Sequence, residues 1–237
     1  MVWATIQSLL RTGKVTDANA TFDVAGSGGQ IEIQDWDGNQ TWLYEYSSDT
    51  GTDQYLQHHD VERLPNGNVL VIAWELKTQA EAVAAGRDPA LIAQDELWPD
   101  KIIEVQQTGP TTGSIVWEWN VWDHLIQDFD NTKANFGVVG DSPQLVDINY
   151  TLNSNSDWLH ANGIDYNASL DQIVLSVHHM SEIWVIDHST TTAQAAAHTG
   201  GTSDKGGDLL YRWGNPQTYD TGVAADQKLF VQHDARW

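Results

Sequence analysis

A repeated arrangement of short apolar strands and tight turns is the feature that most restricts how this chain can fold. Residues 28–33 and 41–46 lie on either side of an acidic turn that contains an Asp-Gly pair. Residues 60–64 and 68–74 flank a Pro-Asn-Gly turn. Apolar runs of this length, bounded by turn residues, predict antiparallel hairpins. The chain should therefore fold mainly from short β-strands.

The same design returns in residues 101–105 with 115–119, and again in residues 182–187 with 208–214. An antiparallel unit that is used repeatedly, with an aromatic strand in each copy, is typical of a β-propeller. We therefore predict an all-β fold built from four-stranded antiparallel blades. A β-sandwich is the alternative, but it would not need histidine-bearing strands at equivalent points of each unit.

Two stretches interrupt the repeats. Residues 79–95 are rich in alanine and predict a short helical insertion, whereas the polar residues 123–156 predict an irregular one. We expect residues 1–237 to form a single β-propeller domain that is incomplete, since they hold about two and a half blades. Open blade edges would then be available for self-association.

Histidines recur at matched places in this pattern. His59, His160 and His233 each stand where a strand is expected to begin. In a propeller the innermost strands begin near the central channel, so these three side chains should converge on one site. Strand neighbours face opposite ways, so of His58 and His59 only one should point into the channel. The same holds for the pair of residues 178 and 179.

Other residues are expected to have structural roles. His124, His188 and His198 lie in predicted loops, where a half-buried imidazole usually has a backbone partner. The matched tryptophans of the aromatic strands should pack between blades. Trp158 and Trp237 stand beside the histidines and are candidates for an aromatic wall.

The charge of the chain excludes some partners. With 33 acidic against 11 basic residues, the formal net charge is −22. Such a surface repels nucleic acids and anionic lipid headgroups, and it suits a salty or extracellular medium. The chain has no cysteine, so disulfides and thiolate metal sites are excluded. No window has the apolar length of a membrane span, and no signal peptide is visible in this chain.

Several motifs in order resemble the bacterial arylsulfate sulfotransferases. They extend over most of the chain, and together they are far more specific than any one alone. The motifs are Gln57-His58-His59-Asp60, Leu64-Pro65-Asn66-Gly67-Asn68, Asp157-Trp158-x-His160-x-Asn162, residues 172–179, residues 207–214 and Gln232-His233-Asp234.

The resemblance implies a six-bladed propeller whose central channel transfers a sulfuryl group from a phenolic sulfate ester to a phenol through a sulfohistidine. It implies no nucleotide sulfate donor, no cofactor and no metal, and a periplasmic or extracellular location. His233 matches the nucleophile, and His160 with Asn162 matches the sulfate-binding and acid-base pair. His59, or alternatively His58, matches the other channel histidine. His178 stands where the family has an arginine, so the cation that would hold the sulfate oxygens is replaced by an imidazole.

Three alternatives remain open at this point. Clustered histidines also suit a divalent metal ion, since neutral imidazoles are common ligands. The domain could instead be a structural or ligand-binding propeller module without catalysis. The acidic turn that begins at Asp35 resembles the start of a calcium loop, although no glutamate follows at the spacing that would complete it.

Overall fold

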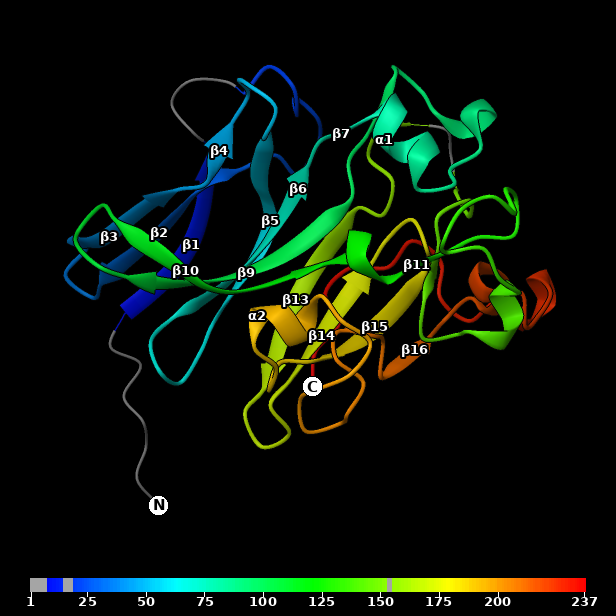
Figure 1. Ribbon diagram of the computed structural model, residues 1–237. Helices are drawn as coiled ribbons and strands as arrows, with labels where there is room; N and C mark the ends of the chain where they lie inside the picture. Colours follow the sequence, from blue (N-terminus) through cyan, green and yellow to red (C-terminus); the bar gives the residue numbers. More distant parts are fainter. Residues whose placement is uncertain (1–7, 15–18, 153–154) are drawn as a thin grey trace.

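The protein is all-β, and its three larger sheets are antiparallel. The computed structural model describes residues 8–14, 19–152 and 155–237 (Figure 1). The larger sheets follow one another along the chain, and two small two-stranded sheets lie in the connections between strands. This arrangement confirms the all-β class and each of the predicted hairpins, whereas the larger sheets have three, five and four strands and are not all four-stranded. No helix in the described ranges is both long and apolar enough to cross a membrane.

The first sheet has three strands in the order β1 (Ser8–Lys14), β2 (Gly29–Asp35) and β3 (Gln40–Glu45). Asp35 closes the turn between β2 and β3, because its Oδ1 accepts the backbone N–H groups of Asp37 and Asn39 at 3.0 and 2.8 Å. A carboxylate that binds the backbone two residues on is the usual device of such turns. The acidic residues of the turn thus have a structural role.

The second sheet has five strands in the order β10-β9-β6-β5-β4, and it forms the centre of the domain in Figure 1. The third has four strands in sequential order, β13-β14-β15-β16. Their bounds are β4 (Ser47–Ser48), β5 (Tyr55–Arg63), β6 (Val69–Glu75), β9 (Asp100–Gln107), β10 (Gly113–Asn120), β13 (Ala161–Asn167), β14 (Gln172–Val177), β15 (Glu182–Asp187) and β16 (Tyr211–Trp213).

Short elements fill the connections. The helix α1 (Gln79–Ala84) begins at a capping box formed by Thr78 and Glu81, and it confirms the predicted helical insertion. The helix is short because Gly86 and then Pro89 follow it. The remaining elements are β7 (Lys77–Thr78), β8 (Glu96–Leu97), β11 (Leu125–Ile126), β12 (Val146–Asp147), α2 (Thr192–Ala195) and the 3₁₀ turns η1 (Pro89–Leu91), η2 (Val121–His124), η3 (Val139–Asp141), η4 (Pro216–Tyr219) and η5 (Ala224–Asp226).

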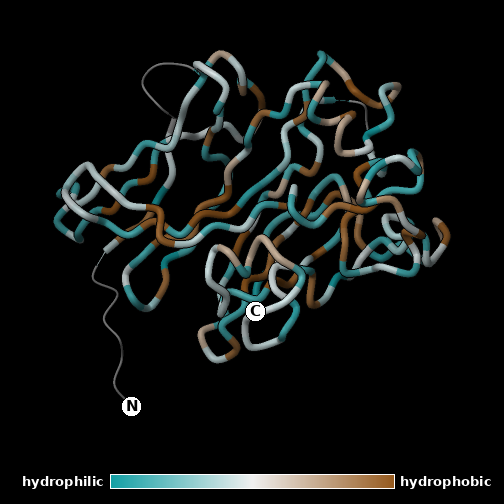
Figure 2. The backbone as a smooth tube through the Cα atoms, in the orientation of Figure 1, coloured by the Kyte–Doolittle hydropathy of each residue, from teal (hydrophilic) through white to brown (hydrophobic). Residues whose placement is uncertain are grey.

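The sheets pack through apolar faces. Apolar residues concentrate along the central strands and polar ones along the peripheral loops (Figure 2). One cluster joins the three-stranded and five-stranded sheets, for example through Ile33 and Val71. A second joins the five-stranded and four-stranded sheets, for example through Ile72, Leu175 and Trp184. Full burial of one such aliphatic side chain stabilises the fold by about 1.5–3 kcal/mol. These clusters therefore hold neighbouring sheets in a fixed relative position.

The matched tryptophans divide into two kinds. Trp42 and Trp117 are buried, and each donates its indole N–H, to Thr112 O and Thr190 Oγ1 respectively. Trp213 lies on the edge strand β16 and is 43% exposed. The prediction of packing between blades therefore fails for Trp213, because β16 has no further strand beyond it in the described sheet.

Candidate active site

Histidine side chains gather where β5, the start of β13 and the C-terminal segment meet. The ring of His59 lies 4.5 Å from that of His160, centroid to centroid. The ring of His178 lies 5.1 Å from that of His160 and 5.1 Å from that of His233. The four histidines predicted from the sequence as site residues are therefore brought together in one continuous series of rings. We call this series, with the adjoining rings of His58 and His179, the histidine cluster.

The inner end of the histidine cluster is buried. His58 is fully buried and stacks on Trp74 at 3.7 Å between centroids, with the planes 7° apart. Its Nδ1 lies 2.9 Å from Nδ1 of His59, and its Nε2 lies 2.8 Å from Asp100 Oδ1. The outer end is open, since His233 is exposed. The cluster thus runs from the core to the surface.

Asp157 fixes the middle of the cluster. His160 hydrogen-bonds through Nδ1 to Asp157 Oδ2, and His179 donates from Nδ1 to the carbonyl oxygen of Asp157 at 2.9 Å. The rings of His160 and His179 are nearly parallel, with centroids 4.9 Å apart. A carboxylate on one ring nitrogen orients the imidazole and sets which nitrogen faces a ligand.

Unusual backbone conformations explain why adjacent histidines share the cluster. His59 has φ of 50° and His160 has φ of 53°, both in the left-handed region. In β5 the register shifts between Gln57 and Val61, so side chains there no longer alternate. His178 and His179 stand in a turn after β14. The expectation that one histidine of each pair would face away was therefore wrong.

The C-terminal segment carries His233 without forming a strand, in contrast to the prediction. It is held by hydrogen bonds from Asn162 Nδ2 to Gln232 O at 2.9 Å and from Gln232 Nε2 to Glu182 O at 2.7 Å. A Cβ on Gly163 would lie 2.9 Å from Cα of Asp234, so the segment can pack this closely only against glycine. The side chain of Asn162 therefore binds the backbone carbonyl of Gln232, the residue before His233.

Burial keeps most of the imidazoles neutral. It lowers the pKa of His58 and of His59 to about 3, and that of His178 to about 4. Burial would also lower the pKa of His160, but the hydrogen bond and the charge of Asp157 outweigh it and the pKa is raised. The pKa of Asp100 is raised well above its usual value by burial. The cluster therefore combines one imidazole whose charged form is favoured with several whose charged form is disfavoured.

Some polar atoms of the site have no protein partner. They are Asn162 Oδ1, His178 Nδ1 and Asp157 Oδ1, all of which are buried. Of these three residues, Asp157 lines a cavity of about 200 Å³, together with Trp98, His160 and His179 among others. Buried polar atoms normally have a partner. The unpaired oxygen of Asp157 is therefore a candidate contact for a polar ligand in this cavity.

The aromatic surroundings differ from those expected. Trp158 is buried in the core and donates its indole N–H to Tyr150 O. Trp237 is 50% exposed, and its backbone N–H binds Asp165. The ring that contacts the histidines is Trp74, which the sequence reasoning missed. Register could have found it, because Trp74 pairs with Leu56, two residues before His58.

A metal site needs several ligand atoms that converge on one point. Among the described residues, such a group of histidine and carboxylate atoms, all within 4.8 Å of one another, is formed by His124, His198 and Asp208. These residues lie outside the histidine cluster. The geometry of the cluster therefore gives the metal alternative no support at this place.

Comparisons with known proteins agree with the resemblance noted in the sequence. A family model described as arylsulfotransferase (ASST) matches residues 17–210, which is most of the chain. No curated protein matches. Among solved structures, a chain of hydrazine synthase from Kuenenia stuttgartiensis is similar, with 10% sequence identity and a TM-score of 0.33. That match covers 79% of this chain and 56% of the hydrazine synthase chain.

Proposed function

Since the chain belongs to the arylsulfotransferase family, we propose that it transfers a sulfuryl group from a phenolic sulfate ester to a phenol through a sulfohistidine on His233. The observation that carries the proposal is the series of rings from His59 through His160 and His178 to His233, with centroid separations of 4.5 to 5.1 Å. A sulfuryl group placed along this series would contact several imidazoles at once.

His233 suits the role of nucleophile because it is exposed and reaches the cluster from a separate segment. In the first step a ring nitrogen of His233 attacks the sulfur, an N–S bond forms and the S–O bond to the aryl group breaks. In the second step the phenol oxygen of the acceptor attacks the sulfur and the N–S bond breaks. The sulfuryl group is thus transferred with no change in oxidation state.

His160 is the proton carrier in this proposal. Its raised pKa favours the imidazolium, which can protonate the departing phenolate in the first step. The neutral ring then accepts the proton of the acceptor phenol in the second step, which restores the starting state. Asp157 stabilises the charged form and keeps the ring in place.

The remaining cluster residues bind the sulfuryl oxygens. Neutral imidazoles at His59 and His178 can each donate one N–H, and Asn162 holds the backbone next to the nucleophile. Charge spreads over these oxygens in the transition state, so fixed donors stabilise it more than the ground state. No cofactor or metal takes part in the proposed reaction.

The fold of the active protein follows from the same proposal. The described sheets pack face to face in chain order, as blades do, and we propose that residues 1–237 form one domain that supplies part of a six-bladed propeller. The open edges, such as β16, would pair with further blades or with other copies. The family suggests a periplasmic or secreted location and small phenolic substrates.

The test uses the purified full-length protein, with the complete propeller, together with 4-nitrophenyl sulfate and a phenol acceptor. We expect release of nitrophenol that depends on the acceptor, and a gain of one sulfuryl group on the peptide containing His233 when the acceptor is omitted. His233→Ala should abolish both signals. Phe230→Ala changes an exposed side chain of the same segment and should leave both unchanged.

Two results would contradict the proposal. Equal turnover by His233→Ala and the unchanged protein would exclude His233 as nucleophile. Binding of a phenolic sulfate without any transfer, across pH and acceptors, would instead favour a ligand-binding propeller module without catalysis.

A further inference from the structure

A second group of polar side chains lies away from the histidine cluster, and the proposed sulfuryl transfer does not use it. His124 is fully buried at the end of η2, and Asp208 is 4% exposed. His198 is exposed, in the segment that follows α2. His124 Nδ1 lies 2.9 Å from Asp208 Oδ1, and His198 Nδ1 lies 2.7 Å from the same oxygen. Two imidazole nitrogens therefore converge on one carboxylate oxygen.

The hydrogen bonds of His124 indicate that a positive charge lies between its Nδ1 and Asp208 Oδ1. Its Nε2 lies 2.8 Å from the carbonyl oxygen of Ala195, to which it donates. In the neutral ring Nδ1 then carries the lone pair, and this lone pair faces a carboxylate oxygen. Such an arrangement requires a positive charge between the two atoms, either a second proton or a metal ion. Metal-binding histidines commonly donate their other nitrogen to a backbone carbonyl, as His124 does.

The surroundings hold His124 in one orientation. Trp119 stacks on its ring, with centroids 5.7 Å apart and planes 7° apart. The indole N–H of Trp119 donates to Gly207 O at 2.7 Å. A Cβ on Gly207 would lie 2.5 Å from His124 Nε2 and 1.9 Å from Ala195 O, so a side chain there would displace the ring. A ligand that is fixed before binding loses little freedom when an ion arrives.

We propose that His124 Nδ1, His198 Nδ1 and Asp208 Oδ1 bind one Zn²⁺ ion. Imidazole and carboxylate ligands suit this ion, which prefers tetrahedral geometry. Neighbouring ligand atoms in such a site are about 3.3 Å apart. The distance from Asp208 Oδ1 to the Nδ1 atom of each histidine must therefore increase by about 0.5 Å when the ion binds. His198 can move outward for this, because its side chain is 60% exposed. The site goes beyond the proposed function and does not depend on it.

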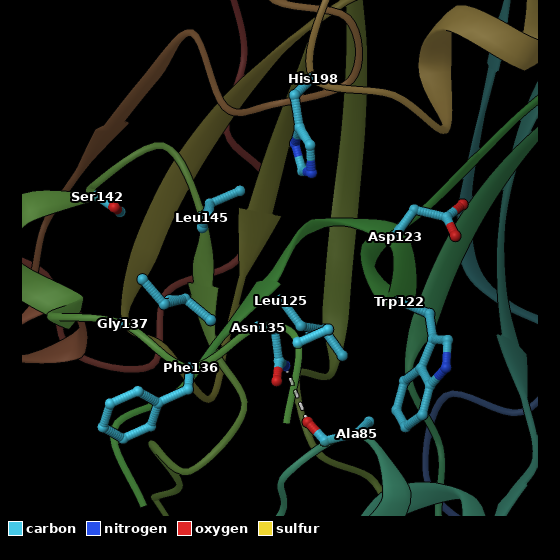
Figure 3. Close-up of a pocket in the computed structure, with 12 residues that line it drawn as sticks. Ala85, Trp122, Asp123, Leu125, Asn135, Phe136, Gly137, Ser142, Leu145 and His198 are labelled. Carbon is cyan, nitrogen blue, oxygen red and sulfur yellow. Dashed lines mark hydrogen bonds between the residues drawn. The ribbon is translucent and has the colours of Figure 1, made fainter. Parts of the chain in front are cut away.

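The fourth position of the ion is open. His198 stands at one side of a cavity of about 490 Å³, which is also lined by Trp122, Asp123 and Asn135. Figure 3 shows the ring of His198 pointing into this cavity. Three protein ligands with an open fourth position are typical of zinc sites that take water or an oxygen-donor ligand. A small ligand with an oxygen donor could therefore reach the ion from the cavity.

The experiment measures Zn²⁺ binding by the full chain, without a histidine tag and after removal of metals with a chelator. We expect one equivalent of Zn²⁺ to bind by calorimetry and by metal analysis. His198→Ala and Asp208→Asn should each weaken binding at least tenfold. Because the His198 side chain is exposed, its removal should leave the circular dichroism spectrum unchanged. His178→Ala, in the histidine cluster, should bind Zn²⁺ as tightly as the unchanged protein.

Co²⁺ provides a second measurement. The chain should give the strong visible absorption of tetrahedral Co²⁺, and His198→Ala should lose it. The proposal fails if no Zn²⁺ binds, in which case a proton on His124 supplies the charge. It also fails if His198→Ala and Asp208→Asn bind Zn²⁺ like the unchanged protein. If His178→Ala alone lost binding, the ion would belong to the histidine cluster and the proposed site would be wrong.

Discussion

His59 and His160 lie 101 residues apart in the chain, yet their rings are 4.5 Å apart and both residues have left-handed backbone, with φ of 50° and 53°. Such a conformation is uncommon outside glycine, although asparagine, aspartate and histidine adopt it more often than other residues do. His59 has it within β5, where the register shifts, and His160 has it directly before β13. The same backbone conformation therefore places a histidine of the five-stranded sheet beside one at the start of the four-stranded sheet.

Asp157→Asn should lower the rate of the first chemical step and shift its dependence on pH. The carboxylate of Asp157 raises the pKa of His160, so the imidazolium persists at higher pH than in a free histidine. As pH rises through this raised pKa, the acid form is lost and the rate should fall. Without the carboxylate the fall should begin at lower pH. Pre-steady-state release of phenol from phenyl sulfate measures both effects, with a loss of about 100-fold at neutral pH.

The leaving group provides the control for this prediction. Nitrophenolate needs less protonation than phenolate, so the loss in Asp157→Asn should be smaller with 4-nitrophenyl sulfate than with phenyl sulfate. An equal loss with both donors would mean that Asp157 acts through the position of His160 and not through its proton.

Gly163→Ala should reduce activity through the position of His233. The added methyl group would lie 2.9 Å from Cα of Asp234, so the C-terminal segment must move away from β13. We expect about a tenfold lower kcat with a similar circular dichroism spectrum, because a small displacement of a reacting group is costly. Gly13→Ala is the matched control for activity, since a Cβ there would lie 3.7 Å from its nearest neighbour, Gln30 Oε1, which is an ordinary van der Waals contact. An unchanged rate in Gly163→Ala would show that the segment can shift without moving His233.

The sequence predicted the all-β class, the hairpins and the convergence of distant histidines, because apolar strands and turn residues leave a clear local pattern. It failed where the backbone departs from strand geometry. Gln57-His58 and Gln232-His233 each precede a residue with positive φ, His59 and Asp234. By its place before a residue with positive φ, His233 is therefore equivalent to His58. The sequence pattern had made it equivalent to His59, which is one residue later.

Other features of the site depend on tertiary packing and leave no local signal. Trp74 stacks on His58, and Asp100 lies against the same ring, only because β5, β6 and β9 are neighbours in one sheet. Likewise, the approach of His124 to Asp208 joins residues 84 positions apart. Spacing along the chain could not predict such contacts.

His188 should contribute a pH-dependent part of the stability. Its Nε2 donates to Glu104 Oε2 at 3.0 Å and its Nδ1 to Asp171 Oδ1 at 2.8 Å, which links β9 to the four-stranded sheet. Burial would lower the pKa of His188, but the hydrogen bonds that it donates to both carboxylates outweigh burial and the pKa is raised. The stabilisation is therefore complete below the unfolded pKa of about 6.5 and is lost as pH rises through the raised folded value.

Urea unfolding at about pH 6 and about pH 9 tests this link. His188→Gln should lower the free energy of unfolding by about 1 kcal/mol at the lower pH and by less at the higher pH. Other groups also titrate over this interval, so the decisive quantity is the difference between the two proteins at each pH. A difference that does not change with pH would mean that His188 acts through packing against Trp117 and Tyr166.

His178→Arg tests whether the cluster lacks a permanent cation. Burial lowers the pKa of His178 to about 4, so this side chain is uncharged at neutral pH. A guanidinium would bind two sulfuryl oxygens with charge-assisted hydrogen bonds, and we expect about a tenfold lower KM for the sulfate donor. His178→Lys, which adds charge without the planar pair of donors, should give a smaller gain. His178→Gln should give none, because it supplies an N–H donor without charge. If all three variants are slower than the unchanged protein, the neutral imidazole is itself the group that the sulfuryl oxygens require.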